Sequence, residues 1–171
     1  MIIKVDSREQ LPLQFDVCGN VTKVLTIGLP FGDYWASIQN KDGSEGQDIP
    51  IIFERKGIED CLTTVTVGAD RFKREIERAN NAGCKLYMII EGSLYDVIRA
   101  ETGRYVKEGS IIKAIFTFKV KYGLEPIFCT DRNEMKRYML ETWEAFGRNF
   151  KHLGAPKSGA EDQTQPIGGI A

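Results

Sequence analysis

Three consecutive charged residues, Glu54, Arg55 and Lys56, end an apolar run within residues 51–60, which read IIFERKGIED. In a β-strand alternate side chains share a face, so Glu54 and Lys56 should project together and Arg55 to the other side. Charges at the end of a buried strand are costly unless they are paired, hydrated or bound to a metal ion. A carboxylate beside an ammonium suits metal-dependent phosphodiester chemistry, because the carboxylate can hold the cation while the lysine meets the phosphate or the attacking water.

Further acidic residues stand at the ends of other expected strands: Asp6, Glu9 and Asp33. The polar, glycine-rich residues 40–48 are expected to form the tip of an antiparallel hairpin. Such a hairpin brings Asp33, at the start of its first strand, close to Glu54, at the end of its second. Taken singly, each residue is more simply interpreted as a surface charge or a turn residue. Taken together, the carboxylates predict an oxygen-ligand site of the kind that selects Mg²⁺ or Mn²⁺.

The apolar pattern of the whole chain predicts alternating strands and helices. Strands are expected at residues 2–5, 21–27, 34–39, 49–56, 85–90 and 125–129. Helices are expected soon after residue 56 and at 69–82, 94–100, 110–122 (capped by Ser110) and 131–150 (capped by Asp131). This order indicates an α/β sandwich, with a central mixed β-sheet flanked by helices. We expect the domain to span residues 1–152, and residues 153–171, rich in glycine, proline, serine and glutamine, to form a flexible C-terminal tail.

The composition excludes several classes of protein. A chain of 171 residues with 42% hydrophobic and 27% charged residues fits a single globular domain. The net charge of -1 argues against a strongly basic DNA-binding domain but allows a local basic face. The four cysteines form no CxxC pair and are interpreted as reduced, mostly core residues. The single histidine, His152, excludes multi-histidine metal sites and is expected on the surface. The chain has neither a signal-peptide pattern nor an apolar run of membrane-span length, so we expect a cytoplasmic or nucleoid-associated protein.

The residues Gly32-Asp33-Tyr34, followed by Glu54-Arg55-Lys56-x-x-x-Asp60, resemble the signature of the XPF-type nuclease domain. This family includes the eukaryotic XPF and Mus nucleases and the archaeal Hef protein, within the restriction-endonuclease-like superfamily. Weaker similarity extends over about residues 2–150. The resemblance implies a restriction-endonuclease-like α/β/α fold. It also implies a Mg²⁺- or Mn²⁺-dependent DNA endonuclease that hydrolyses phosphodiester bonds in branched, flapped or forked DNA during repair, recombination or replication.

The same resemblance implies a role for each matching residue. The metal ligands would be Asp33 and Glu54, with contributions from Asp6 and Glu9. Lys56 would position or polarise the attacking water, while Arg55 and Asp60 organise the site and the Arg55 backbone oxygen faces the metal. Contacts to DNA are expected from Arg8, Arg71, Arg74 and Arg78. The last three lie along one side of the expected helix, although a solvated helix face explains them equally well. One departure is Glu75, where the family often has glutamine.

Two alternatives remain open. The family contains non-catalytic subunits that pair with an active one, and the superfamily contains junction resolvases and restriction-type nucleases. The tandem helix-hairpin-helix module that often follows this domain is not found in these residues, so a separate targeting protein is expected as a partner. A homodimer is also expected, from the resemblance and from the apolar residues Ile111, Ile112, Ile115 and Phe116.

Overall fold

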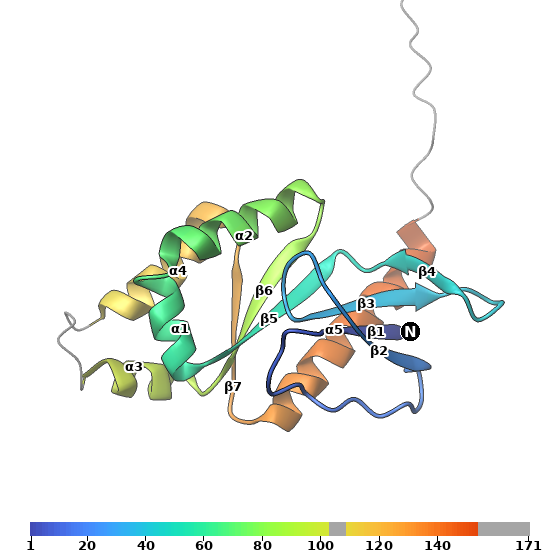
Figure 1. The fold of residues 1–171 in the computed structure, drawn as a ribbon, viewed down its shortest axis with the longest axis horizontal. Coiled ribbons are helices and arrows are strands. Elements are labelled where there is room, and N and C mark those ends of the chain that lie inside the picture. Colours follow the sequence, from blue (N-terminus) through green and yellow to red (C-terminus); the bar gives the residue numbers. More distant parts are fainter. Residues whose placement is uncertain (103–108, 154–171) are drawn as a thin grey trace, which may run out of the picture.

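A computed structural model describes residues 1–102 and 109–153 (Figure 1). Its strands are β1 (Ile2–Asp6), β2 (Lys23–Ile27), β3 (Tyr34–Gln39), β4 (Glu45–Asp48), β5 (Ile51–Gly57), β6 (Lys85–Glu91) and β7 (Glu125–Cys129). Its helices are α1 (Ile58–Val65), α2 (Ala69–Asn81), α3 (Leu94–Thr102), α4 (Ser110–Tyr122) and α5 (Arg132–Leu153). The predicted tail lies outside the described residues, apart from residue 153, which ends α5.

The strands form one mixed sheet in the order β2-β1-β3-β5-β6-β7, with β4 paired to β3 (Figure 1). Strand β1 is parallel to β2 and antiparallel to β3, and β3 is antiparallel to β5. Strands β5, β6 and β7 run parallel to one another. The carboxyl ends of β1 and β5 therefore flank the amino end of β3 at one edge of the sheet.

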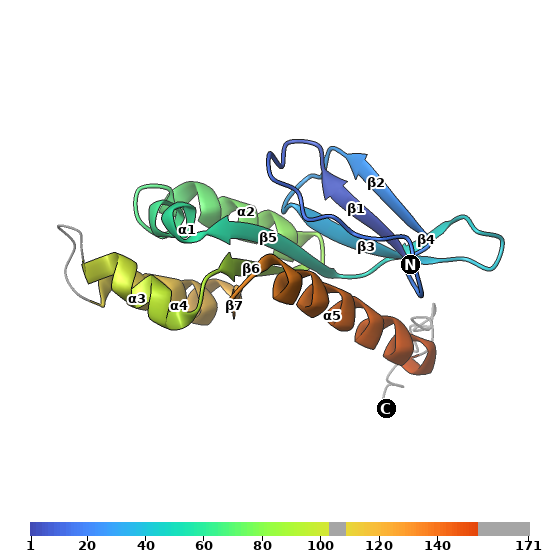
Figure 2. The ribbon, with the colours of Figure 1, turned by 90° about the horizontal axis from the view of Figure 1, so that it is seen from below.

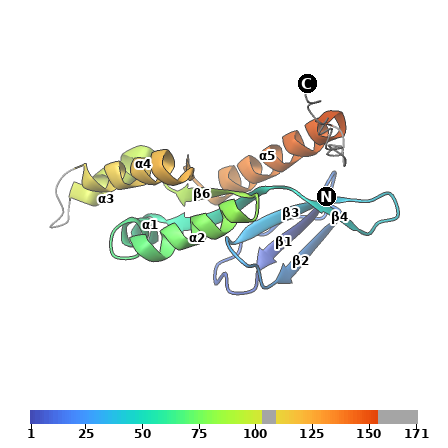
Figure 3. The ribbon, with the colours of Figure 1, turned by 90° about the horizontal axis from the view of Figure 1, so that it is seen from above.

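Helices cover both faces of the sheet, which confirms the predicted α/β sandwich. Figures 2 and 3 show α1 to α4 gathered at one end of the molecule, while α5 runs along the strands at the other. Successive side chains of β5 point to opposite faces of the sheet, so this strand contributes to the packing on both sides. Ile52 packs into the core beneath α1 to α4, and Phe53 packs against the buried Trp143 of α5, with ring centroids 5.2 Å apart.

Several predicted boundaries need correction. The expected strand at 49–56 is interrupted at Pro50, where the Ile51 N–H donates to the Ile49 carbonyl (2.7 Å) in a three-residue turn. Residues 45–48, predicted as part of the hairpin tip, form β4 instead. The strand expected at 21–27 begins at Lys23.

The predicted helix caps have different outcomes. Gly109, with a left-handed φ of 77°, is the N-cap of α4, so the prediction that Ser110 caps this helix is wrong. Asp131 does cap α5, because its Oδ1 accepts the N–H groups of Asn133 (2.7 Å) and Glu134 (2.9 Å). Helix α5 continues past residue 150 to Leu153.

Three of the four cysteines are buried and all are free thiols, as expected. The side chain of His152 lies outside the described residues. Within residues 1–102 and 109–153, none of the helices has the length and apolar character that crossing a bilayer requires.

Candidate functional site

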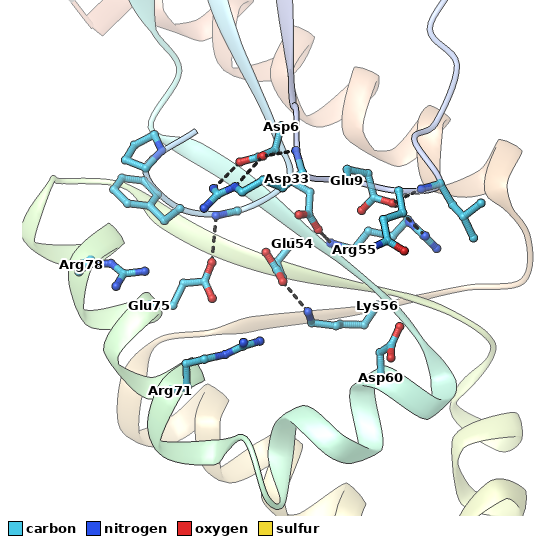
Figure 4. Close-up of a pocket in the computed structure, with 16 residues that line it drawn as sticks. Asp6, Glu9, Asp33, Glu54, Arg55, Lys56, Asp60, Arg71, Glu75 and Arg78 are labelled. Carbon is cyan, nitrogen blue, oxygen red and sulfur yellow. Dashed lines mark hydrogen bonds and ion pairs between the residues drawn. The ribbon is translucent and has the colours of Figure 1, made fainter. Parts of the chain in front are cut away.

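The sheet edge at the ends of β1 and β5 opens into a cleft of about 750 Å³ between the strands and α2 (Figure 4). The strand order explains why charged residues meet here, because it places the ends of β1 and β5 beside the start of β3. Most of the predicted site residues line this cleft: Asp6, Arg8, Glu9, Asp33, Glu54, Arg55, Lys56, Asp60, Arg71 and Arg78. Arg74 is exposed on α2 but is not part of the lining.

The turn before β3 aims Asp33 at β5. Gly32 adopts a φ of +66°, and a Cβ atom there would overlap Cγ2 of Ile52, so only glycine fits. The Asp33 N–H donates to the Phe53 carbonyl (2.8 Å). Its Oδ2 accepts the backbone N–H of Arg55 (2.8 Å). The Asp33 carboxylate is therefore fixed by backbone contacts to the neighbouring strand.

Glu54 and Lys56 lie on one face of β5, as the strand alternation predicts. Lys56 Nζ donates to Glu54 Oε1 at 2.5 Å, and only 7% of Glu54 is exposed. Burial and the nearby Asp33 charge raise the pKa of Glu54 to about 8. Burial disfavours the Lys56 ammonium, but the Glu54 carboxylate beside it raises the pKa of Lys56 above its ordinary value.

Asp33 shares this tendency to bind protons. Burial raises the pKa of Asp33 to about 6, although the Arg55 N–H opposes the shift. The pKa shifts of Asp33, Glu54 and Lys56 thus have the same direction. The buried cluster holds protons more tightly than the same groups would in water, mainly because burial disfavours the charged carboxylates.

Asp6 is held by arginine in this structure. Its carboxylate accepts bonds from the Arg8 backbone N–H (2.7 Å), from Arg8 Nε (2.9 Å) and Nη2 (2.5 Å), and from the Leu29 N–H (3.1 Å). The side-chain hydrogen bond from Arg8 holds the pKa of Asp6 below its ordinary value. These bonds use Nε and Nη2 of Arg8, whose side chain is 71% exposed, so its expected contact with DNA stays a prediction.

Glu9 also has an arginine partner: its Oε1 accepts Arg55 Nη2 (3.2 Å) and the Leu11 N–H (2.8 Å). Among the described residues, no three histidine, cysteine, aspartate or glutamate side chains are grouped so as to hold a metal ion. The ligand roles of all four carboxylates stay predictions; Asp6 and Glu9 are paired with arginine side chains, whereas Glu54 is paired with Lys56 and Asp33 accepts a backbone N–H.

Comparison with known proteins identifies the domain. Residues 5–141 match the ERCC4 domain. The chain belongs to the ERCC4 domain family. Two similar solved structures are XPF from Aeropyrum pernix and its complex with DNA. The first has 17% identity and a TM-score of 0.59, with 90% of this chain and 68% of the other covered. The second has 18% identity and a TM-score of 0.54, with 93% and 68% covered. No curated protein matches the sequence. The predicted XPF-type resemblance and fold are confirmed.

Sequence reasoning missed one acidic residue of this ERCC4 domain site. Glu75, on α2, accepts the Gly32 N–H (3.1 Å) and lines the cleft, as Figure 4 shows. It thereby ties α2 to the turn that carries Asp33. The spacing in the sequence could have indicated its position. Glu75 lies four residues after Arg71 and three before Arg78, so it shares their helix face. From the sequence alone, Glu75 is named only as a departure from the family pattern, not as a member of the site.

The raised pKa values predict how the stability of the metal-free ERCC4 domain depends on pH. In the folded state Asp33 and Glu54 keep protons that they release in the unfolded chain. The stability that this gives is fully present below about pH 4 and is lost as the pH rises through the folded pKa of Asp33, about 6, and that of Glu54, about 8. We expect the melting temperature, measured in a chelator, to fall across this range, by roughly 2–4 °C for each kcal/mol lost. An Asp33→Asn variant should lack the lower step. A metal-free wild-type protein that becomes steadily more stable from about pH 5 to about pH 9 would contradict the assigned shifts.

Proposed function

We propose that this ERCC4 domain is a Mg²⁺- or Mn²⁺-dependent DNA endonuclease that hydrolyses phosphodiester bonds in branched, flapped or forked DNA. The observation that carries the proposal is the buried Glu54–Lys56 pair beside Asp33, in a cleft that arginines flank. Membership of the ERCC4 domain family supports a nuclease-like role. The complex of the similar Aeropyrum pernix XPF with DNA supports DNA as the ligand.

Asp33 and Glu54 fit a hard divalent cation. Their carboxylates are buried and repel each other, which a cation would relieve. Mg²⁺ in phosphoryl-transfer sites is commonly held by one or two carboxylates, with water and substrate phosphate oxygens completing its shell. A bound cation would lower the pKa of the attacking water and neutralise charge that develops on the phosphate.

The remaining steps belong to side chains of the protein. Because Glu54 raises the pKa of Lys56, the lysine remains an ammonium near neutral pH and serves as a donor to the phosphate or the attacking water, not as a base. The Arg55 N–H keeps Asp33 in place. Water attacks phosphorus in line with the 3′ oxygen: the water oxygen bonds to phosphorus as the bond to the 3′ oxygen breaks. The proton released by the water is balanced by protonation of the departing oxygen, so that the products are a 3′ hydroxyl and a 5′ phosphate.

A panel of labelled DNA substrates tests the function: flap, fork, four-way junction, single strand and linear duplex, each with Mg²⁺, Mn²⁺ or a chelator. We expect metal-dependent cutting of the flap or fork. Preferred cutting of the four-way junction would assign a resolvase instead. DNA binding without cutting of any substrate, together with no heat of Mn²⁺ binding in calorimetry, would assign a non-catalytic DNA-binding subunit.

Arginines on α2 are proposed to bind the DNA backbone beside the cleft. Arg71 and Arg78 line the cleft, whereas Arg74 does not. Each phosphate contact adds roughly one unit to the slope of log affinity against log salt concentration. We therefore expect Arg71→Ala and Arg78→Ala each to weaken flap binding roughly uniformly across sequences and to reduce this slope by about 1.

Arg74→Ala is the matched comparison, because it removes the same charge from the same helix. Its effect on the salt slope should be clearly smaller. Fluorescence anisotropy at several salt concentrations measures all three variants. If Arg74→Ala weakens binding as much as Arg71→Ala, the DNA contacts extend along α2 beyond the cleft wall.

Protein partners also remain proposals. The expected homodimer rested partly on α4, but Ile111 and Ile115 are buried in the core, with 2% and 0% exposed. Phe116 is exposed, at 41%, and Ile112 is half-buried against the same core. The apolar pattern of α4 is thus explained mainly by packing on the sheet. Homodimerisation and a separate targeting protein are tested by light scattering and by co-purification.

A further inference from the structure

Beside the cleft, on the opposite face of β5 from Glu54, the guanidinium of Arg55 joins a series of ion pairs. Its Nη2 lies 3.2 Å from Glu9 Oε1, and its Nη1 lies 2.9 Å from Glu91 Oε2. The same Glu91 oxygen lies 3.4 Å from Nη1 of Arg132, the first residue of α5. We call Glu9, Arg55, Glu91 and Arg132 the arginine clamp. Figure 4 shows its first members, Glu9 and Arg55, beside Asp33.

The far end of the clamp holds the loop that follows β1. Arg132 Nη2 donates to the backbone oxygens of Leu11 (2.7 Å) and Pro12 (3.0 Å). The Leu11 N–H donates in turn to Glu9 Oε1 (2.8 Å). The Leu11 side chain is largely exposed, so apolar burial does little to fix this part of the loop. At Leu11 itself the attachments are therefore polar bonds to the clamp, whereas two residues further on the loop is anchored by the buried Leu13.

The near end of the clamp fixes the strand segment that carries the site. The Arg55 side chain is largely buried, and its Nε has no hydrogen-bond partner among the described residues. Its position thus depends on the two carboxylates of the clamp. The backbone N–H of the same residue holds Asp33, and its chain neighbours are Glu54 and Lys56. A shift of the Arg55 guanidinium would therefore also displace Asp33, Glu54 and Lys56.

We propose that Glu91 and Arg132, which do not line the cleft, are positioning residues for the nuclease site. They act through Arg55 on the peptide that holds Asp33, and through Leu11 on the loop that forms one wall of the cleft. The proposal rests on the proposed nuclease function. Arginine suits position 132 because its planar fork can bond the carboxylate and both carbonyl oxygens together, whereas the single ammonium of a lysine is a poor substitute.

The test compares Arg132→Met with the control Arg148→Met, which removes an exposed arginine from the same helix. Single-turnover cleavage of a labelled flap with excess enzyme gives a rate constant that does not depend on the fraction of inactive protein. We expect Arg132→Met to lower the rate constant at saturating enzyme on the order of 10-fold, because small displacements of reacting groups are costly. The enzyme concentration at half-saturation should change less than about 3-fold, since Arg71 and Arg78 are untouched.

Three further tests separate positioning from general destabilisation. Amide exchange at Leu11 should accelerate in Arg132→Met and stay unchanged in Arg148→Met. Arg132→Lys should recover part of the rate. The double variant Glu91→Gln/Arg132→Met should be no slower than the slower single variant, because both changes break the same clamp.

Equal rates for Arg132→Met and wild type, or multiplicative effects in the double variant, overturn the positioning role. A wild-type protein that cuts no substrate overturns the nuclease proposal itself, and the exchange measurement still reports whether the clamp orders the loop.

Discussion

Replacing Asp33 with asparagine is expected to slow DNA cleavage about 1,000-fold, which corresponds to about 4 kcal/mol of lost transition-state stabilisation. The physical reason is charge, because the amide has nearly the shape of the carboxylate but attracts a divalent cation far less. The asparagine Oδ1 can still accept the Arg55 N–H that holds Asp33 in place. Single-turnover cleavage of the preferred substrate, with Mg²⁺ or Mn²⁺ in excess, measures the loss.

The same substitution should not destabilise the folded protein at alkaline pH. The raised pKa of Asp33, about 6, means that its ionised form is disfavoured in the native state, so above this pH the charge lowers stability. Metal-free Asp33→Asn should therefore melt at or above the wild-type temperature at about pH 8. Asp70→Asn, an exposed change on α2, is the matched control and should leave cleavage unaffected. Wild-type cleavage by Asp33→Asn would remove Asp33 from the site, and an unfolded variant would show that its role is structural.

Local pattern was sufficient to predict which strand ends meet. The alternation of β5 predicts that Glu54 and Lys56 share a face, and a 2.5 Å ion pair joins them. The hairpin prediction placed Asp33 beside β5, where its carboxylate bonds the strand backbone. Both features follow from the two-residue alternation of side chains along a strand and from antiparallel pairing across a hairpin. Both patterns can be recognised in a single sequence.

The choice of ion-pair partners was not predictable in the same way. Asp6 and Glu9 were expected to contribute to a metal site, yet arginines hold both. The Asp6–Arg8 pair spans only two residues and was visible in the sequence. The clamp instead joins Glu9 to residues far along the chain. Its last member, Arg132, is brought to the clamp because α5 packs against the sheet. Residue type alone does not show which opposite charges pair, because tertiary distance decides which of them meet.

Lys56→Met is expected to slow cleavage about 100-fold, the usual cost of losing one preorganised donor to a reacting group. The apolar side chain keeps most of the lysine volume, so loss of the positive charge is the main change. The substitution leaves Glu54 buried without its partner, a change that is destabilising while the carboxylate is ionised. Because the pKa of Glu54 is raised to about 8, the carboxyl group can take up a proton near neutral pH and limit that cost. The variant should therefore stay folded at about pH 7 and lose stability more steeply than wild type towards about pH 9. Lys73→Met, an exposed change on α2, serves as the control.

Lys56→Arg then distinguishes an ammonium that donates from an amine that accepts a proton. The raised pKa of Lys56 predicts the first role, and an arginine, which stays charged, should preserve more of the rate than methionine does. A lysine that acted as a general base would leave Lys56→Arg as slow as Lys56→Met. In that case the wild-type rate would also rise with pH as the ammonium loses its proton. Measuring the single-turnover rate of all three proteins between about pH 6 and about pH 9 decides between these roles, because only the base mechanism combines the rising profile with equal damage from both substitutions.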